Sequence, residues 1–504
     1  MTVPRIGLPE ASYTVGRVSR LEDRSATGSG EGRDEDSGAT PDSAIETARE
    51  AEQETAEESE TAAGPTHFAR IHGMLARHEF LTSVMKVMSG TGIAQLIAMV
   101  ATLYVTHRVP PAEWGTYAAI MAVAQFVVPV AALRYDMAIV LPREDGEAKR
   151  IFRLATLINA VVSVLAMIVM VPVGGMLANA LGAPQARWWM LAVGPIIFTF
   201  AELAVVNYWA NRRKRFGVIG TNAVWNQSVT AGGRIVAAFA GLGGFGQLAA
   251  TLVGEIAALG NFWKRLGKDL RSIPESDTPL RLLLRKYIKM PLLTAPNAIV
   301  DSLRLQGINL SIGLYFSRAT LGTFNMAWAL MQVPASVINT ALSQVFFQRL
   351  SVTDAGRMYK SVKSSVIRSA LLGVIPFAAL YFLIPPVLPR LMGSQYAISA
   401  QIAVALVPWL YFNFITSPIS MMFIVTRNNG IALAFAIVYA AVPLGYLAIS
   451  HHEIVQTIYV MSFVMAGLLA FYIGLALIVA KRFDSRYQRG DAVPAGSVVD
   501  APQD

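Results

Sequence analysis

The chain has 504 residues, of which 54% are hydrophobic and 15% are charged, whereas an ordinary soluble domain is about 25% charged. With a mean hydropathy of +0.47, this composition excludes a water-soluble globular protein. The absence of cysteine excludes disulfide frameworks, thiol catalysis, iron–sulfur clusters and cysteine-ligated zinc, and the six histidines form no zinc-protease motif. We therefore expect no metal and no cofactor.

The amino-terminal segment differs in charge from the rest of the chain. Residues 1–66 contain 15 acidic and 6 basic residues, whereas residues 67–504 contain 18 acidic and 36 basic residues. A segment with so few apolar residues cannot bury enough surface to offset the entropy of ordering. We predict that residues 1–80 form a disordered acidic cytoplasmic tail, which acts either as a solvated spacer or as an arm that binds a partner.

A series of apolar runs follows the tail. Each run is near the ~20 residues that a helix needs to cross a bilayer. The runs cover residues 82–105, 115–141, 152–176, 188–210, 217–240, 245–263, 288–316, 321–348, 367–389, 398–425, 430–449 and 454–480. They predict an all-α polytopic membrane protein with twelve transmembrane helices.

Basic residues between the runs predict the orientation, because Lys and Arg concentrate in short cytoplasmic loops. If the amino terminus is cytoplasmic, 28 basic residues fall on the cytoplasmic side and 4 on the opposite side. Adding or removing one span would destroy this alternation. We therefore predict a multi-pass protein of the cytoplasmic (inner) membrane with both termini cytoplasmic, and with residues 481–504 as a cytoplasmic carboxy-terminal tail.

The longest cytoplasmic connection divides the spans into two sets of six. We predict a half of residues 82–263, a cytoplasmic linker of residues 264–287 and a half of residues 288–480. The linker either carries a short interfacial helix or only satisfies the topology with its basic residues. The halves share a faint repeat: Gly-Thr-Tyr begins the second span at position 115, and Gly-Thr-Phe begins the eighth at position 322. This repeat indicates a duplicated six-helix unit with a substrate path between the halves.

Charged residues inside the spans are the candidate functional residues, because a charge at the bilayer centre costs roughly 2.5–3.5 kcal/mol. In the seventh span, Asn297, Asp301 and Arg304 share one helix face. The Asp–Arg pair either satisfies itself against a neighbouring helix or lines a cavity where it contacts substrate or a coupling ion.

Other polar residues complete the predicted site. Guanidinium groups suit phosphate oxygens, so Arg134, Arg234 and Arg304 are predicted to form a cationic track for a phosphorylated substrate. Lys86 either joins this track or extends its charge to the interface. The candidate ion-coupling or polar cavity residues are Asp301, Glu255, Asp136, Asn297 and Gln227, and Glu202 also lies near mid-depth.

The segment of residues 108–152 resembles the bacterial polysaccharide-export flippases, a branch of the multidrug/oligosaccharidyl-lipid/polysaccharide exporter superfamily. Members often show a Gly-x-Tyr-Ala start to the second span, here at residues 115–118. An Arg-Tyr-acid-x-Ala-Ile-x-Leu-Pro segment ends that span, here RYDMAIVLP at residues 134–142, and Glu147-Ala148 follows. These motifs cover about a tenth of the chain directly.

The resemblance implies two six-helix lobes that form a V around a polar, cationic cavity. It implies a flippase, not an enzyme, that moves polyprenyl-pyrophosphate-linked oligosaccharides outward for O-antigen, exopolysaccharide or capsule synthesis. Transport would proceed by alternating access powered by an ion gradient, and the chain has no P-loop motif for ATP. The implied partners are the lipid-linked oligosaccharide, membrane lipids and polysaccharide polymerase or export machinery, with no nucleic acid.

The main alternative is a cation-coupled multidrug exporter of the same superfamily, which would favour acids and aromatic residues over arginine in its cavity. A peptidoglycan-precursor flippase would usually carry additional spans. A membrane glycosyltransferase would need acidic catalytic motifs such as Asp-x-Asp, and a polymerase would need large external loops. The predicted external loops are all short, and no such motif lies in a loop.

Overall fold

The computed structural model describes residue 87 and residues 89–332, 357–419, 422–426, 428–450 and 452–488. The chain divides into two units, Met1–Ala76 and Arg77–Asp504, and all described residues belong to the second. The regular elements in these described ranges are helices, so the fold is all-α as predicted. The predicted acidic tail, Lys86 and residues 489–504 lie outside the described residues.

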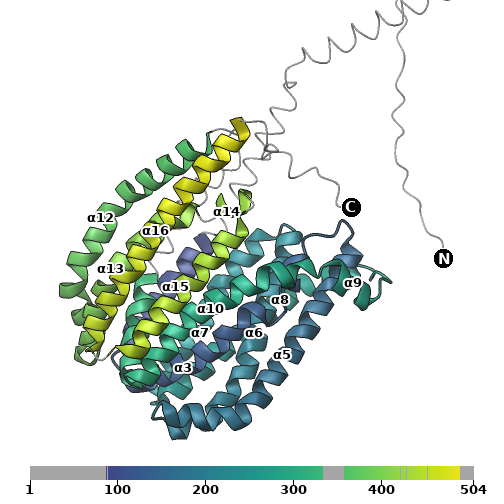
Figure 1. The fold of residues 1–504 in the computed structure, drawn as a ribbon. Coiled ribbons are helices and arrows are strands. Elements are labelled where there is room, and N and C mark those ends of the chain that lie inside the picture. Colours follow the sequence, from purple (N-terminus) through teal and green to yellow (C-terminus); the bar gives the residue numbers. More distant parts are fainter. Residues whose placement is uncertain are drawn as a thin grey trace, which may run out of the picture. The chain divides into compact units, whose positions relative to one another are not determined.

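The first group of helices contains the predicted first half. Its elements are the helix Ser89–Val105, α3 (Pro111–Val127), η1 (Val128–Val130), α4 (Tyr135–Ala138), α5 (Asp145–Ala180), η2 (Pro184–Ala192), α6 (Val193–Arg212), α7 (Phe216–Phe239) and α8 (Gly243–Ser272). Helix α7 packs along α8, α5 packs along α6, and α3 contacts α6, α8 and η2 (Figure 1). Helix α3 thus lies at the centre of this group.

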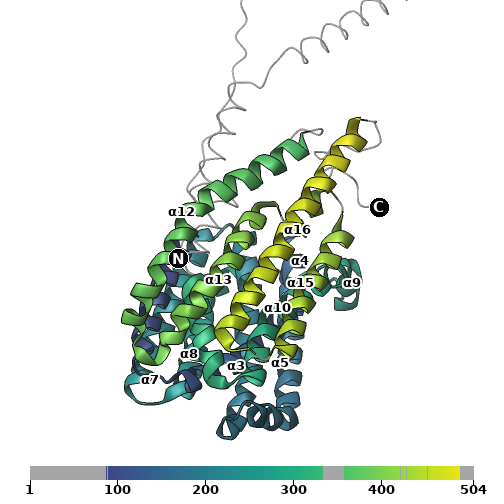
Figure 2. The same cartoon turned by 60° about the vertical axis from the view of Figure 1, so that its left-hand side comes forward.

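The second group follows the linker. Its elements are α9 (Leu280–Lys286), α10 (Lys289–Tyr315), a helix at 318–332, α12 (Met358–Met392), η3 (Ser394–Tyr396), α13 (Ala397–Thr416), η4 (Ser417–Ile419), α14 (Met422–Val425), α15 (Asn429–Ile449) and α16 (Ile454–Gln488). Helices α12, α13 and α16 pack together (Figure 2), and α15 packs against both α10 and α16. Helix α10 also packs on α3, so it joins the two groups.

Six helices in the described ranges are long and apolar enough to cross a membrane. They are Asp145–Ala180, Pro184–Arg212, Met358–Met392, Ser394–Ile419, Gly430–Ile449 and Ile454–Arg486. Helices α3, α7, α8 and α10 coincide with other predicted spans, although α3 has only 17 residues. Helix α7 has 24 residues and α10 has 27, so each is ~36–40 Å long, which exceeds the ~30 Å hydrocarbon core.

Large apolar side chains cover the outer surface of the spanning helices. On α12, for example, Ile375 is 78% exposed and Phe382 is 72% exposed. A soluble monomer rarely exposes such continuous apolar surface, whereas a lipid-facing helix requires it. The chain is therefore a multi-pass membrane protein.

Two predicted spans in the described ranges are interrupted near a proline. The predicted span 115–141 breaks after α3, because Pro129 has no backbone N–H to donate and the chain turns at Leu133 and Arg134, whose φ angles are 47° and 62°. The predicted span 398–425 likewise changes to a 3₁₀ turn at Ser417–Ile419, which contains Pro418. Conversely, α8 continues nine residues beyond the predicted end at position 263.

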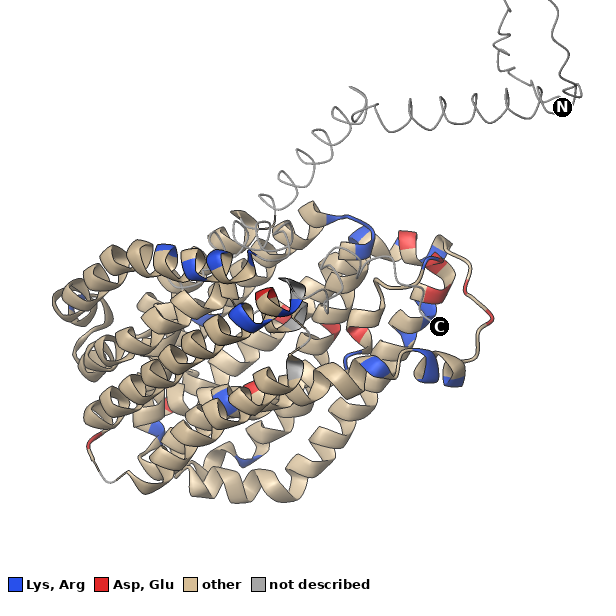
Figure 3. Ribbon diagram, turned by 45° about the horizontal axis from the view of Figure 1, so that its top comes forward, with Lys and Arg blue, Asp and Glu red and all other residues tan. Residues whose placement is uncertain are grey.

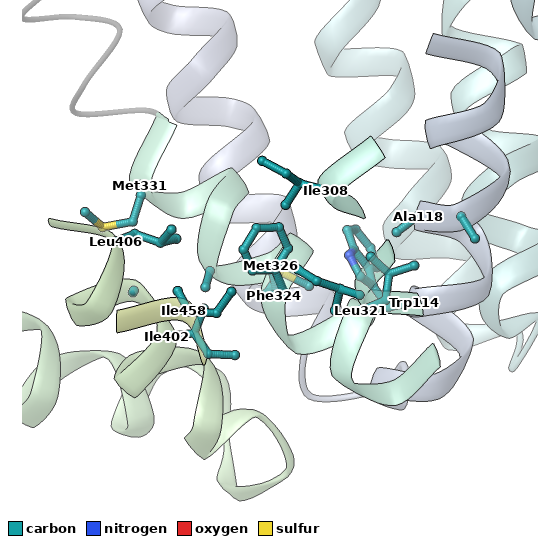
Figure 4. Packing of buried hydrophobic residues seen from close by; sticks show 14 of the residues in the cluster. Trp114, Ala118, Ile308, Leu321, Phe324, Met326, Met331, Ile402, Leu406 and Ile458 are labelled. Carbon is teal, nitrogen blue, oxygen red and sulfur yellow. The ribbon is translucent and has the colours of Figure 1, made fainter. Parts of the chain in front are cut away.

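The largest apolar core joins the two groups of helices. Trp114 on α3 lies beside Leu321 of helix 318–332, and Phe324 and Ile308 lie nearby (Figure 4). Each of these four side chains is at most 2% exposed. Because lipid is as apolar as these side chains, their contribution inside a membrane comes from close van der Waals packing rather than from escape from water.

The linker between the groups is fastened to α5 rather than free. Lys149 donates to the carbonyl of Ile273 at 2.6 Å, and Arg150 and Arg153 both pair with Glu275. Acidic and basic residues gather at this end of the first group (Figure 3). We call it the charged end and define it by the loops 139–145, 213–215 and 273–279.

Helix α9 is held at the same end by a second acid. The carboxylate of Glu147 accepts from Lys286 at 2.7 Å and from the Tyr287 hydroxyl at 3.0 Å. The hydrogen bond that Lys286 donates to Glu147 raises the pKa of Lys286. Leu283 is fully buried while Leu282 is 53% exposed, so α9 has one face against the protein and one face open.

Replacing Asp484 with alanine is expected to destabilise the protein. Asp484 on α16 is 9% exposed and accepts from the backbone N–H groups of Met358 at 3.0 Å and Tyr359 at 2.9 Å. It therefore caps α12 from another helix, and loss of a cap costs about 1–2 kcal/mol. Thermal unfolding in detergent should show a lower midpoint for Asp484→Ala, with Asp484→Asn closer to wild type. The exposed Asp277→Ala is the control, and an equal midpoint for the two alanine variants would contradict the capping role.

Candidate functional site

Two glycines bring the halves into close contact. A Cβ atom on Gly115 would lie 1.7 Å from the carbonyl oxygen of Arg318, and one on Gly322 would lie 1.9 Å from the carbonyl oxygen of Pro111. Each oxygen belongs to the residue four positions before the opposite glycine, so the contact is self-complementary in the manner of a two-fold interface. The faint sequence repeat at positions 115 and 322 is thus one physical contact. We call the end of the bundle that contains it the glycine end.

A polar bridge crosses the same contact. The indole N–H of Trp114 donates to Oδ1 of Asn325 at 3.1 Å, and Nδ2 of Asn325 donates to Oδ1 of Asn309 on α10 at 3.5 Å. Asn309 is 8% exposed, so the bridge is shielded from solvent. Sequence reasoning did not single out these three residues, because single asparagines in apolar runs carry no distinguishing pattern.

Arg234 lies near the glycine end, on α7. It donates to the hydroxyl of Tyr117 at 2.5 Å and to Oγ1 of Thr251 at 3.1 Å. Its guanidinium also lies 5.6 Å from the ring centre of Trp114, which is within cation–π range. The guanidinium is therefore held by α3 and α8, although its Nε has no partner among the described residues.

Arg304 and Asp301 form an ion pair on α10. Nη2 of Arg304 donates to Oδ1 of Asp301 at 2.6 Å, and the guanidinium lies 4.9 Å from the ring centre of Tyr439 on α15. The Arg304 side chain is 14% exposed, whereas that of Asp301 is 63% exposed. Asn297, one turn earlier, is also exposed. The structure thus brings together the predicted pair, and Arg304 has further N–H donors besides the one that Asp301 accepts.

The support for Arg304 comes from distant parts of the chain. The Tyr439 hydroxyl accepts from the indole N–H of Trp409 at 2.6 Å, and the Tyr439 ring stacks on Phe435. Tyr439 is buried, so its ring is a fixed surface for the cation. Arg304 is therefore oriented by a carboxylate on its own helix and an aromatic ring on another.

Arg134 and Asp136 lie at the break after α3. Nη1 of Arg134 donates to the carbonyl of Pro129 at 3.2 Å, while Nε of Arg134 and Oδ1 of Asp136 have no partner among the described residues. Asp136 is 7% exposed. Leu133 and Arg134 are consecutive non-glycine residues with positive φ angles, and each such residue costs about 1–3 kcal/mol. The backbone is therefore strained where the motif of residues 134–142 begins.

Replacing Arg134 with glycine is expected to raise the midpoint of thermal unfolding while lowering transport. Glycine adopts a φ of 62° without strain, so stability should rise by about 1 kcal/mol, whereas the guanidinium is lost. Lys214 offers a matched control, because its φ is 53° and its side chain is exposed. Lys214→Gly should be stabilising without loss of transport; equal transport by both variants would remove Arg134 from the site.

Two buried acids lie between helices of the first group. Oε1 of Glu255 accepts from Nδ2 of Asn226 at 3.0 Å, while its Oε2 has no partner among the described residues. Glu202 accepts from Thr156 at 2.8 Å and from Asn159 at 3.3 Å, so both of its oxygens are bonded. Gln227, which follows Asn226, is half-buried.

The predicted site residues therefore occupy separate places. Asp301 and Arg304 are in contact, and Arg134 and Asp136 are neighbours. Arg234 and Glu255 both lie in the α7–α8 pair, with Arg234 nearer the glycine end. Among the described residues, no group of three or more His, Cys, Asp or Glu side chains is arranged to hold a metal ion.

Comparison with solved structures shows that the fold is similar to that of several membrane transporters, two of them described as members of the MOP superfamily. The lipid II flippase MurJ, in an inward closed conformation, matches with a TM-score of 0.61 and 12% identity over 82% of this chain and 93% of its own. An inward-facing multidrug resistance transporter of the MATE family matches with a TM-score of 0.59 and 14% identity over 79% and 96% of the two chains. A MOP superfamily transporter from Pyrococcus furiosus gives 0.54 and 14% over 81% and 96%.

The family is shown by the sequence itself. The model of the family described as "Polysaccharide biosynthesis protein" matches residues 109–401, which is more than half of the chain. The chain belongs to this family. No curated protein matches it.

Proposed function

We propose that this protein is a flippase that moves polyprenyl-pyrophosphate-linked oligosaccharides across the cytoplasmic membrane for the synthesis of O-antigen, exopolysaccharide or capsule. The observation that carries the proposal is the Arg304 side chain, which is oriented by Asp301 and Tyr439 and is 14% exposed, in a chain of the polysaccharide biosynthesis family. A fixed guanidinium binds pyrophosphate oxygens with several parallel hydrogen bonds. The similar fold of the lipid II flippase supports a lipid-linked substrate.

The proposed architecture is a V of two six-helix lobes with both termini cytoplasmic. It is supported by the overlap of α3, α7, α8 and α10 with predicted spans and by the self-complementary glycine contact. The concentration of basic residues at the charged end supports a cytoplasmic position for that end. The glycine end then lies toward the outside.

The proposed mechanism is alternating access without covalent chemistry. With the glycines in contact, the outer end is closed, and the substrate reaches Arg304 from the cytoplasmic leaflet. The pyrophosphate binds the guanidinium while the polyprenyl tail stays in hydrocarbon, where it costs no desolvation. Separation of α3 from helix 318–332 then opens the outer end, and an ion gradient drives the cycle. Polysaccharide polymerase or export machinery would take up the delivered units.

A second candidate function is export of a cationic drug. It is favoured by the 63% exposure of the Asp301 carboxylate, which could pair with a cationic cargo, and by the similar fold of MATE transporters. The two functions make opposite demands on the Asp–Arg pair, because an anion needs Arg304 and a cation needs Asp301.

Reconstitution distinguishes the two functions. The full chain is placed in liposomes with a fluorescent sugar linked to polyprenyl pyrophosphate, and membrane-impermeant dithionite reports how fast the probe changes leaflet. We expect flipping that Arg304→Ala slows strongly. Ethidium uptake into the same vesicles tests the alternative. Ethidium transport that depends on Asp301, without movement of the lipid probe, would replace the flippase with the drug exporter.

A further inference from the structure

Polar side chains follow the contact between α7 and α8 along most of its length. At the charged end, Nδ2 of Asn261 donates to Oδ1 of Asn222 at 2.7 Å, and Arg265 donates to Thr221 at 3.2 Å. Near the glycine end, Thr251 accepts from Arg234 at 3.1 Å. The two helices thus carry polar groups at both ends of their contact.

Glu255 lies at the middle of the same contact. It accepts from Asn226, whose Oδ1 in turn accepts from Oγ1 of Thr230 at 3.2 Å. A Cβ atom on Gly254 would lie 1.8 Å from Oγ1 of Thr230, so the two helices pack closely here and a larger residue at position 254 would displace the Thr230 side chain. Glu255 is 5% exposed, and its second oxygen is buried without a partner among the described residues.

Glu255 differs from the paired acids of this half and from Glu202, whereas Asp136 is also buried with one bare oxygen but lies two residues from the cationic Arg134. At the charged end, Asp145, Glu147, Asp269 and Glu275 are each paired with Arg or Lys. Glu202 has no cation, but neutral donors occupy both of its oxygens. Glu255 combines deep burial, the lack of a cationic partner within the described residues and one bare oxygen.

The elements around Glu255 supply no countercharge among the described side chains. On α7, Arg234 lies two turns from Asn226 and is bonded to Tyr117 of α3 and to Thr251. On α6, the acid is Glu202, which is bonded to α5 residues. A buried carboxylate without a countercharge is strongly disfavoured, whereas the protonated acid needs only hydrogen bonds. The bare Oε2 is the atom on which a proton fits.

We propose that Glu255, between α7 and α8, is a proton-binding site that couples the transport cycle to a proton gradient. The inference rests on the flippase function and adds the coupling ion and its location, away from the Arg304 site. Binding forms an O–H bond at Oε2 and removes the charge; release breaks that bond and returns the proton to water on the other side of the membrane.

Interruptions in the polar series fit a carrier rather than a channel. No hydrogen bond among the described residues joins the Asn226–Glu255 pair to the Asn222–Asn261 pair, which lies about one turn away toward the charged end. An unbroken chain of hydrogen bonds would let protons leak and would dissipate the gradient. A proton bound to Glu255 is instead released only when a movement of α7 against α8, or entry of water, connects Glu255 to one side of the membrane.

The experiment uses the full chain in liposomes with the fluorescent polyprenyl-pyrophosphate sugar and an imposed pH gradient. One proton per substrate should shift the steady-state ratio of probe between leaflets by up to about tenfold per pH unit. Glu255→Gln should still equilibrate the probe but lose this response to the gradient. Glu202→Gln is the matched control and should keep it.

A binding measurement makes the result independent of transport. In infrared titration of the full chain in lipid, wild type and Glu202→Gln should show a protonated-carboxyl band that Glu255→Gln lacks. If wild type moves the probe but Glu255→Gln keeps its gradient response, or if the band survives in that variant, Glu255 is not the coupling site. If wild type does not move the probe, the flippase function fails, while the infrared result still decides whether Glu255 binds the proton.

Discussion

Replacing Gly115 with leucine is expected to abolish transport while leaving the helices folded. Even one added carbon at this position would lie 1.7 Å from the carbonyl oxygen of Arg318, a separation that real Cβ atoms do not reach. The glycine end therefore cannot close, and the cycle stops with that end open. Gly322→Leu should have the same effect, because its Cβ atom would meet Pro111 in the same way.

Cysteine labelling measures this effect directly, because the chain contains no cysteine. Leu321 is fully buried at the contact, so Leu321→Cys should resist a membrane-impermeant maleimide in the wild-type background and react in the Gly115→Leu background. Gly92→Leu is the control, since a Cβ atom there would have no neighbour within 4 Å. Full transport by Gly115→Leu, or equal labelling in both backgrounds, would show that the glycine contact is not the outer closure.

Arg304→Ala is expected to reduce the initial flipping rate of the pyrophosphate-linked probe by about ten- to a hundred-fold. Hydrogen bonds to charged groups contribute about 1.5–3 kcal/mol each. The Arg304 guanidinium is already oriented by its contact with the Tyr439 ring. Arg304→Lys should recover part of the rate, because lysine keeps the charge but loses the planar set of donors. The rate is measured from dithionite reduction in liposomes.

Two variants control this prediction. Arg390→Ala removes an exposed arginine whose bond is to the carbonyl of Pro386 on its own helix, and it should flip the probe at the wild-type rate. Asp301→Asn removes the ion-pair partner but keeps a hydrogen-bonding group, so it should impair flipping less than Arg304→Ala. A larger defect in Asp301→Asn than in Arg304→Ala would favour a cationic cargo.

Much of the helical plan could be predicted from the sequence, because long apolar runs have few other solutions in a membrane. The Asp301–Arg304 pair was also predictable, since residues three positions apart on a helix share a face. The break at Arg134 was not, because the motif at residues 134–142 does not reveal that Leu133 and Arg134 adopt positive φ angles. The sequence showed the Gly115 and Gly322 repeat but not that the two glycines meet.

The contacts that distinguish the candidate residues depend on helix rotation, which sequence patterns leave undetermined. Tyr439 is 135 positions away from Arg304, and no period in the sequence connects them. Likewise, Glu202 and Glu255 look alike as single acids in apolar runs, and only their hydrogen bonds separate a fully bonded acid from one with a bare oxygen.

The reciprocal arrangement around Gly115 and Gly322 bears on how the chain arose. Each glycine packs against the carbonyl oxygen of the residue four positions before the other glycine. Both sides of the contact therefore have the same local structure, as in a two-fold symmetric interface between identical chains. A half-length precursor with one such glycine could thus have associated with a second copy of itself before the two genes fused. Fusion would then have allowed each copy to change independently, which accounts for Arg234 and Glu255 in one half and Asp301 and Arg304 in the other.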